Sequence, residues 1–313
     1  MNRETPDAVL FNPQVVVEPG DHRDFYDEFP EVHRRMAEAS DVLGVDLAAR
    51  FYAEDPAAIN DGTVVRPASV AIAVAICDVI GLRKRPPRYM AGLSLGSIVA
   101  AHLGGFMSFR DTIRMVSTMP AVEDRVVAGR PLGVAFYYNV DLDRFQAEMR
   151  EVSTAESPLL TCAITADNQM IATGAVAGLQ ELNLRAASIG GVGLVIPYGP
   201  PAHSPLPVLY DIKETFAREW SYLDPTSDPQ VPQLCNHTGA VIDRREDLMA
   251  AFVEQYTRTV RWDLVVRRLA DLGVKRVTVV GPGHFVYRSM QFVDVSYQVQ
   301  TVLTCAELRS AAE

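Results

Sequence analysis

The feature that most restricts the fold is a short apolar segment, residues 89–91, that runs into the pentapeptide Gly-Leu-Ser-Leu-Gly at residues 92–96. A helical pattern follows from Ser97. Small residues on both sides of Ser94 allow a chain to turn sharply from a strand into a helix and leave the serine exposed on the turn. A strand, a glycine turn and a helix in this order predict an α/β protein.

Other segments extend this alternation of strands and helices. Residues 9–11 have the pattern of a short buried strand, residues 21–42 have helical periodicity, and residues 68–79 predict a second helix. Near the end of the chain, Arg-Val-Thr-Val-Val-Gly-Pro-Gly at residues 276–283 predicts a buried parallel strand that ends in a glycine turn. These segments indicate one large α/β body.

The middle of the chain has a different order of elements. The expected elements are a strand at 133–140, a helix at 141–152, strands at 160–165 and 170–173, a helix at 176–187 and a strand at 192–196. The order βαββα is typical of a small split-βαβ sheet. We therefore expect an α/β-hydrolase-like large subdomain, residues 1–126 and 198–313, with an inserted small ferredoxin-like subdomain, residues 127–197.

Composition excludes several classes of protein. The net charge of −10 argues against nucleic acid as the main partner. The longest apolar stretch, residues 67–82, contains Asp78 and is too short and too interrupted to span a bilayer. No secretory signal pattern is visible, so we expect a cytoplasmic protein without membrane contact. The four cysteines are scattered among apolar neighbours, which predicts reduced core thiols and no metal site.

Ser94 is the candidate nucleophile, because the helix after it points its first N–H groups toward the serine, where they can stabilise an oxyanion. The alternative is a glycine-rich helix cap with a serine that takes no part in chemistry.

A serine hydroxyl needs a nearby base. His33 and His102 lie in predicted helices, whereas His203 lies in a loop held by prolines, Tyr-Gly-Pro-Pro-Ala-His-Ser-Pro at residues 198–205. Such a loop is a good place for a base, although the pattern alone leaves other histidines open.

At this point the chain resembles a family, the malonyl-CoA:acyl carrier protein transacylases and the acyltransferase domains of polyketide synthases. The resemblance covers nearly the whole chain in the same order. The matching stretches are residues 92–96, His-Ser-Pro-Leu at 203–206, Val-Arg-Trp at 260–262 and Gly-Pro-Gly at 281–283. It implies Ser94 as nucleophile and His203 as base.

The resemblance also implies roles for backbone groups. Phe-Asn-Pro-Gln at residues 11–14 occupies the place of a glutamine-containing loop, so Gln14 and Leu95 would supply the oxyanion-hole N–H groups. Gln255 would orient the histidine through its carbonyl, and no third carboxylate would be needed. The valines at 15–17 depart from the small and polar residues of the family pattern and leave the geometry of this loop in question.

Other departures concern the acyl pocket, for which we expect Leu93, Met119 and Ala202 as lining residues. Members that transfer malonyl carry an arginine that clamps the free carboxylate, and that position falls on Met119. Methionine cannot replace a bidentate arginine; Arg114 and Arg125 are possible substitutes from the same region. Ala202 stands where those members have phenylalanine, which frees volume. The alternative is drift in a small pocket.

We therefore expect an acyltransferase for an uncharged acyl group, with bulky groups included. It would act by a ping-pong acyl-serine mechanism in polyketide biosynthesis. It would bind no resident cofactor; its substrate would be a phosphopantetheine thioester of acyl carrier protein or of coenzyme A, with acyl carrier protein as its partner. The alternatives are a thioester hydrolase that edits carrier proteins, an inactive scaffold that binds them, and transfer to a hydroxyl or amine.

Overall fold

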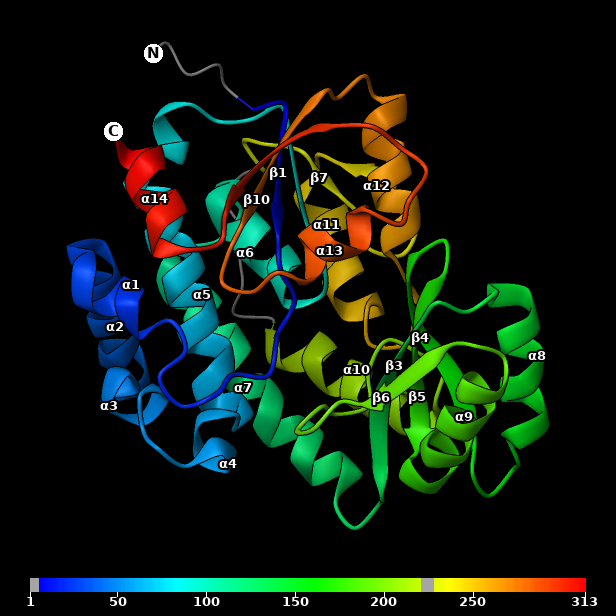
Figure 1. Ribbon diagram of the computed structural model, residues 1–313. Coiled ribbons are helices and arrows are strands. Elements are labelled where there is room, and N and C mark those ends of the chain that lie inside the picture. The colour runs from blue at the N-terminus through cyan, green and yellow to red at the C-terminus, as the bar shows by residue number, and fades with distance from the viewer. Residues whose placement is uncertain (1–5, 221–227) are drawn as a thin grey trace.

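The computed structural model describes residues 6–220 and 228–313, and its main body is built on a six-stranded sheet in the order β11-β10-β1-β2-β7-β8 (Figure 1). All neighbouring pairs are parallel except β7 with β8, which is antiparallel. The strands are β1 (Ala8–Phe11), β2 (Tyr89–Gly92), β7 (Gln233–Leu234), β8 (Val241–Ile242), β10 (Arg276–Val280) and β11 (Gln298–Val302).

The register of the central strands determines where the site lies. Phe11 at the end of β1 pairs with Gly92 on one side and with Val280 on the other. The three strands therefore end at the same edge of the sheet, and the loops after β1 and β2 meet there. In open α/β sheets, ligands bind outside the carboxyl ends of the strands.

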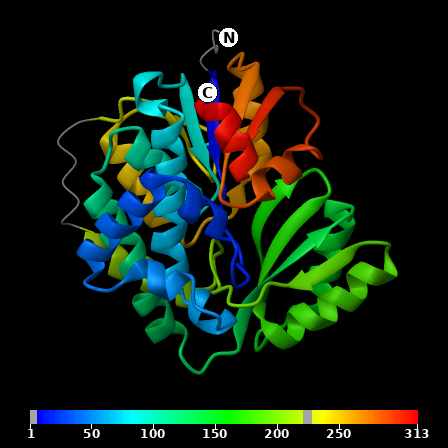
Figure 2. The same ribbon diagram turned by 60° about the vertical axis from the view of Figure 1, so that its left-hand side comes forward.

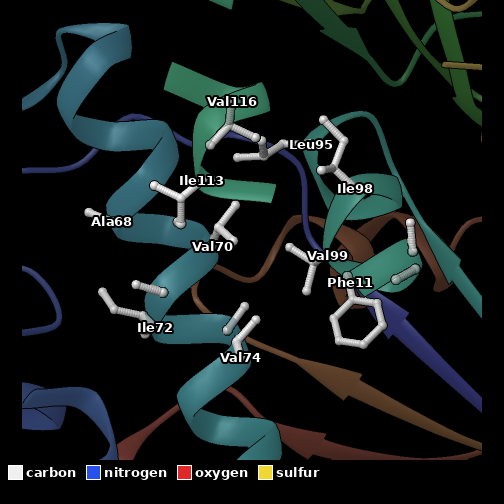
Figure 3. Close-up of a cluster of buried hydrophobic side chains, with 14 of the residues drawn as sticks. Phe11, Ala68, Val70, Ile72, Val74, Leu95, Ile98, Val99, Ile113 and Val116 are labelled. Atoms are coloured by element: carbon white, nitrogen blue, oxygen red, sulfur yellow. The ribbon is translucent and has the colours of Figure 1, made fainter. Parts of the chain in front are cut away.

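Helices cover this sheet on both faces. Those before the insert are α1 (Arg23–Glu28), α2 (Pro30–Leu43), α3 (Leu47–Phe51), α4 (Pro56–Ile59), α5 (Gly62–Val79), η1 (Leu82–Lys84), α6 (Leu95–Leu103) and α7 (Phe109–Val127). Those after it are α10 (Pro207–Glu219), α11 (Arg245–Glu254), α12 (Trp262–Asp271), α13 (Phe285–Met290) and α14 (Cys305–Ala312). Figure 3 shows apolar side chains of α5, α6 and α7 meeting beside Phe11 of β1.

Helix α5 forms the centre of this core. It starts at Gly62, earlier than the predicted residue 68, because Asp61 caps it by accepting a hydrogen bond from the Thr63 N–H, and Pro67 lies inside the first turns. By length and composition alone it would pass as a membrane span, but 78% of its residues are buried inside the protein. A buried core helix gives the same composition.

The predicted helix over residues 21–42 is in fact two helices, α1 and α2. Phe29 between them has an extended backbone, with φ −110° and ψ 113°. Pro30 explains the break, since proline disfavours helical backbone in the residue before it and is well tolerated at the first helical position. The sequence pattern did not predict the break between α1 and α2, because the apolar face of the helical pattern continues across it.

The second sheet has the order β6-β3-β5-β4-β9. Its strands are β3 (Leu132–Tyr138), β4 (Leu159–Ala166), β5 (Gln169–Ala175), β6 (Val192–Val195) and β9 (Val260–Arg261). Helices α8 (Leu142–Val152) and α9 (Val176–Ser188) lie on the side of this sheet away from the main body (Figure 2). The fold class is confirmed: an α/β large subdomain with a small ferredoxin-like one. The boundaries at 127 and 197 stay a prediction, and β9 lies outside them.

Candidate active site

Ser94 lies on the turn between β2 and α6, with a backbone conformation that few residues with a side chain adopt, φ 52° and ψ −113°. The glycines on either side make this turn possible. A Cβ at Gly92 would lie 1.9 Å from the carbonyl carbon of Gly96, and a Cβ at Gly96 would lie 2.4 Å from the carbonyl oxygen of Phe11. The strand end, the helix start and β1 therefore pack backbone against backbone, and this packing holds Ser94 at the N-terminus of α6.

Substitution of Gly92 by alanine should destabilise the protein, because backbone atoms of Gly96 cannot move without displacing α6. We expect Gly92→Ala to lower the free energy of unfolding by about 3 kcal/mol, measured by urea denaturation. Gly133→Ala is the matched control, since a Cβ there would meet Val176 at an ordinary 3.4 Å. Equal stability of the two variants would contradict this view of the turn.

His203 approaches the serine from the loop between β6 and α10. Its Nε2 lies 2.8 Å from Ser94 Oγ, and its Nδ1 lies 2.7 Å from the backbone carbonyl oxygen of Gln255, the residue that ends α11. A carbonyl oxygen only accepts, so Nδ1 carries the proton in the neutral ring. Nε2 is then the free acceptor for the serine hydroxyl, which is the arrangement a general base requires.

The surroundings of His203 favour its neutral form. Burial lowers the pKa of His203 from 6.5 to about 4, with a smaller lowering from nearby His237, while the hydrogen bond to the Gln255 carbonyl acts in the opposite direction. A low pKa keeps the imidazole unprotonated at neutral pH. The ring can therefore accept a proton throughout the physiological range.

The predicted oxyanion-hole residues lie on either side of this pair. Leu95 is the first residue of α6, and the N–H groups of a first helical turn have no carbonyl partner within the helix. Gln14 lies in the loop after β1, and its side-chain Oε1 accepts a hydrogen bond from Arg66 Nε at 2.7 Å. This bond holds the loop through the Gln14 side chain. The role of the Gln14 backbone N–H in the oxyanion hole remains a prediction.

A cavity of about 330 Å³ opens beside Ser94, and all eight residues singled out from the sequence line it. Its wall is largely apolar and comes from both subdomains. The eight residues are Gln14, Leu93, Ser94, Leu95, Met119, Ala202, His203 and Gln255. Apolar residues of the second sheet complete the wall: Val134, Phe136, Ile171 and Leu194.

Two charged residues that line the cavity were not predicted from the sequence. Arg66 of α5 and Glu123 of α7 both line it, and both are buried, with 5% and 4% exposure. Arg114 and Arg125, considered as substitutes for a clamp at Met119, do not line it among the described residues; both are exposed. A signal was present, because Arg66 interrupts an apolar run, Val-Val-Arg-Pro-Ala at residues 64–68.

Curated proteins of similar sequence include two bacterial enzymes of one kind. The malonyl CoA-acyl carrier protein transacylase of Haemophilus influenzae is 27% identical over 285 residues, which cover 88% of each chain. That of Bacillus subtilis is 24% identical over 283 residues, 88% of this chain and 86% of the relative. The phenolphthiocerol synthesis polyketide synthase Pks15/1 of Mycobacterium marinum is 26% identical over 88% of this chain and 13% of its own length. No protein-family model matches the sequence.

Solved structures agree with these relatives. An acyl-carrier-protein S-malonyltransferase from Burkholderia pseudomallei superimposes with a TM-score of 0.85 at 26% identity, over 97% of this chain and 98% of the other. A malonyl-transacylase solved with a type II polyketide synthase acyl carrier protein shares the fold, with a TM-score of 0.88 at 23% identity, over 97% and 98%. The chain is therefore a homologue of the malonyl-CoA:acyl carrier protein transacylases and polyketide synthase acyltransferase domains, and it is an acyltransferase.

Proposed function

We propose that this acyltransferase moves an uncharged acyl group between thioester carriers, with Ser94 as nucleophile and His203 as base. The observation that carries the proposal is the apolar cavity wall at Met119. Met119 is buried, at 8% exposure, at the place where the resemblance puts a carboxylate-binding arginine. Arg66 is the only lysine or arginine among the described lining residues, and Glu123 already pairs with it.

The first half-reaction follows from the geometry. Ser94 Oγ attacks the thioester carbonyl carbon while its proton passes to His203 Nε2 at 2.8 Å. The N–H groups of Leu95 and Gln14 would hold the negative oxygen of the tetrahedral intermediate. The C–S bond then breaks, the departing thiolate takes the proton from Nε2, and the acyl group remains on Ser94 as an ester.

The second half-reaction reverses these steps with another thiol. His203 Nε2 accepts the proton of a phosphopantetheine thiol, whose sulfur attacks the acyl ester and leaves as a thioester. Ser94 recovers its proton from His203. We propose acyl carrier protein as the partner that presents this thiol, supported by the carrier proteins named for several relatives and by the similar fold of a transacylase solved with one.

The apolar wall of the cavity supports an uncharged acyl group. The cavity volume of about 330 Å³ is at the lower end of the range for ligand pockets in general. Ala202, beside the base, contributes only a methyl group to the wall, and Val134, Phe136 and Ile171 contribute hydrocarbon surface. An alkyl or aryl chain would bury apolar surface against this wall, whereas a free carboxylate would find no unpaired lysine or arginine among the described lining residues. We also propose that this acyl transfer takes place in polyketide biosynthesis.

Intact-protein mass spectrometry with a panel of acyl thioesters tests the proposal. We expect the wild-type protein to gain the mass of butyryl or larger uncharged acyl groups within minutes. Malonyl should load at least about 100-fold more slowly, because its carboxylate would lack the buried ion pair that an arginine at position 119 would provide. Rapid malonyl loading would overturn the uncharged substrate class. Release of the acyl group at the same rate with and without carrier protein would identify a hydrolase instead of a transferase.

A further inference from the structure

A buried ion pair lies inside the acyl cavity, between helices α5 and α7. Arg66 Nη1 lies 3.0 Å from Glu123 Oε1, and Arg66 Nη2 lies 2.6 Å from Glu123 Oε2. This is the two-pronged arrangement in which arginine binds carboxylates most strongly. The side chains are 7% and 6% exposed. The carboxylate that fills the guanidinium fork therefore belongs to the protein itself.

Two further hydrogen bonds hold the pair in place. Arg66 Nε donates to Gln14 Oε1 at 2.7 Å, and the Tyr256 hydroxyl donates to Glu123 Oε1 at 3.2 Å. Gln14 and Tyr256 also line the cavity. Tyr256 follows Gln255, whose carbonyl bonds to His203. The pair is thus fixed on both sides, and neither charge can turn away to meet a substrate without breaking several bonds.

A substrate carboxylate would meet an unfavourable environment here. Met119 and Glu123 are four residues apart on α7, so they lie on the same side of that helix and both reach the cavity. A free carboxylate near Met119 would approach Glu123, and two carboxylates that share one site repel each other strongly when water is excluded. It would also lose its own hydration without a free guanidinium fork to replace it.

We propose that Glu123 is a specificity-determining residue that excludes acyl groups with a free carboxylate, because it occupies the guanidinium of Arg66. The inference rests on the proposed function and names the device that sets its substrate class. Arg66 would be a latent carboxylate site. Removal of the negative charge at Glu123, with Arg66 kept, should open this site to a dicarboxylic half-thioester such as malonyl.

Glu123→Gln is the variant that tests this inference, because it keeps the size of the side chain and removes the charge. The readout is the rate of acyl-Ser94 formation with malonyl thioester relative to butyryl thioester, which has a chain of similar length. We expect this ratio to rise about 100-fold, equivalent to about 2.8 kcal/mol at 1.4 kcal/mol per tenfold. Arg66→Met in the same background should cancel the gain, since the cation is then gone.

Asp124→Asn is the matched control. Asp124 is the next residue on the same helix, carries the same charge, is exposed and does not line the cavity among the described residues. Its malonyl-to-butyryl ratio should remain that of the wild type. An unchanged ratio in Glu123→Gln, or an equal rise for malonyl and butyryl, would overturn the inference. Neither result would contradict the proposed function, which is tested by the acyl groups that load onto the wild-type protein.

A second measurement covers the case in which Glu123→Gln is too unstable to assay. Removal of one partner of a buried pair leaves an uncompensated charge, and a small carboxylate should relieve it. Acetate is therefore expected to raise the melting temperature of Glu123→Ala by several degrees relative to equal chloride, while the wild-type protein shows no difference. If acetate and chloride act alike on the variant, no latent carboxylate site exists and the inference fails.

Discussion

Ser94→Ala is expected to abolish acyl-enzyme formation, so that no thioester of the panel adds mass to the protein. Thioester consumption should fall by at least about 10³-fold, because loss of a nucleophile that acts as a unit with its base removes most of the catalysis. The geometry gives the reason: Ser94 Oγ is the atom in contact with His203 Nε2, at the N-terminus of α6. Intact mass and release of free thiol measure the two effects.

The variant should remain folded, since alanine carries the same Cβ as serine and places no new atom in the turn. A melting temperature within a few degrees of the wild type would show this. Ser188→Ala is a suitable control, because Ser188 ends α9 and, in the described part of the chain, its hydroxyl donates only to the Arg185 carbonyl oxygen, at 2.7 Å. It should load normally. Full acylation of Ser94→Ala would assign the nucleophile to another residue.

Local patterns of the sequence predicted the fold well where one element determines its own shape. The strand, glycine turn and helix around Ser94 depend on residues 89–97, so a motif of nine residues sufficed. The break before Pro30 and the early start of α5 were missed, because a helical apolar pattern continues through the first, and Pro67 obscured the second. Strand β9 was missed as well, since two residues carry no periodicity and join β4 from far along the chain.

The candidate site shows the same division. The eight residues were predicted from the motifs of the chain together with its resemblance to a known family, and the structure places them around one cavity. The ion pair did not follow, because Arg66 and Glu123 are 57 positions apart and Glu123 and Tyr256 are 133 apart. The sequence predicts a substitute cation near Met119, on α7, whereas the guanidinium in the cavity comes from α5. Only packing of the two helices reveals that the charges cancel each other.

His203→Ala should slow acylation by about 10³- to 10⁴-fold, the contribution expected of a positioned general base and its orientation. The pH profile separates this role from mere packing. Because the pKa of His203 is lowered to about 4, the base is neutral and active above that value. The wild-type acylation rate should then stay level from pH 8 to about 5 and fall as the pH drops through 4, when Nε2 gains a proton and can no longer accept one from Ser94. In His203→Ala this acidic limb should vanish, leaving a low rate that rises with hydroxide.

Stopped-flow thiol release between pH 3.5 and 8.5 measures both profiles, with circular dichroism at each pH to show that the protein is folded. A wild-type rate that already halves near pH 6.5 would mean that the surroundings of His203 do not lower its pKa. Retention of the acidic limb in His203→Ala would assign the base to a different group.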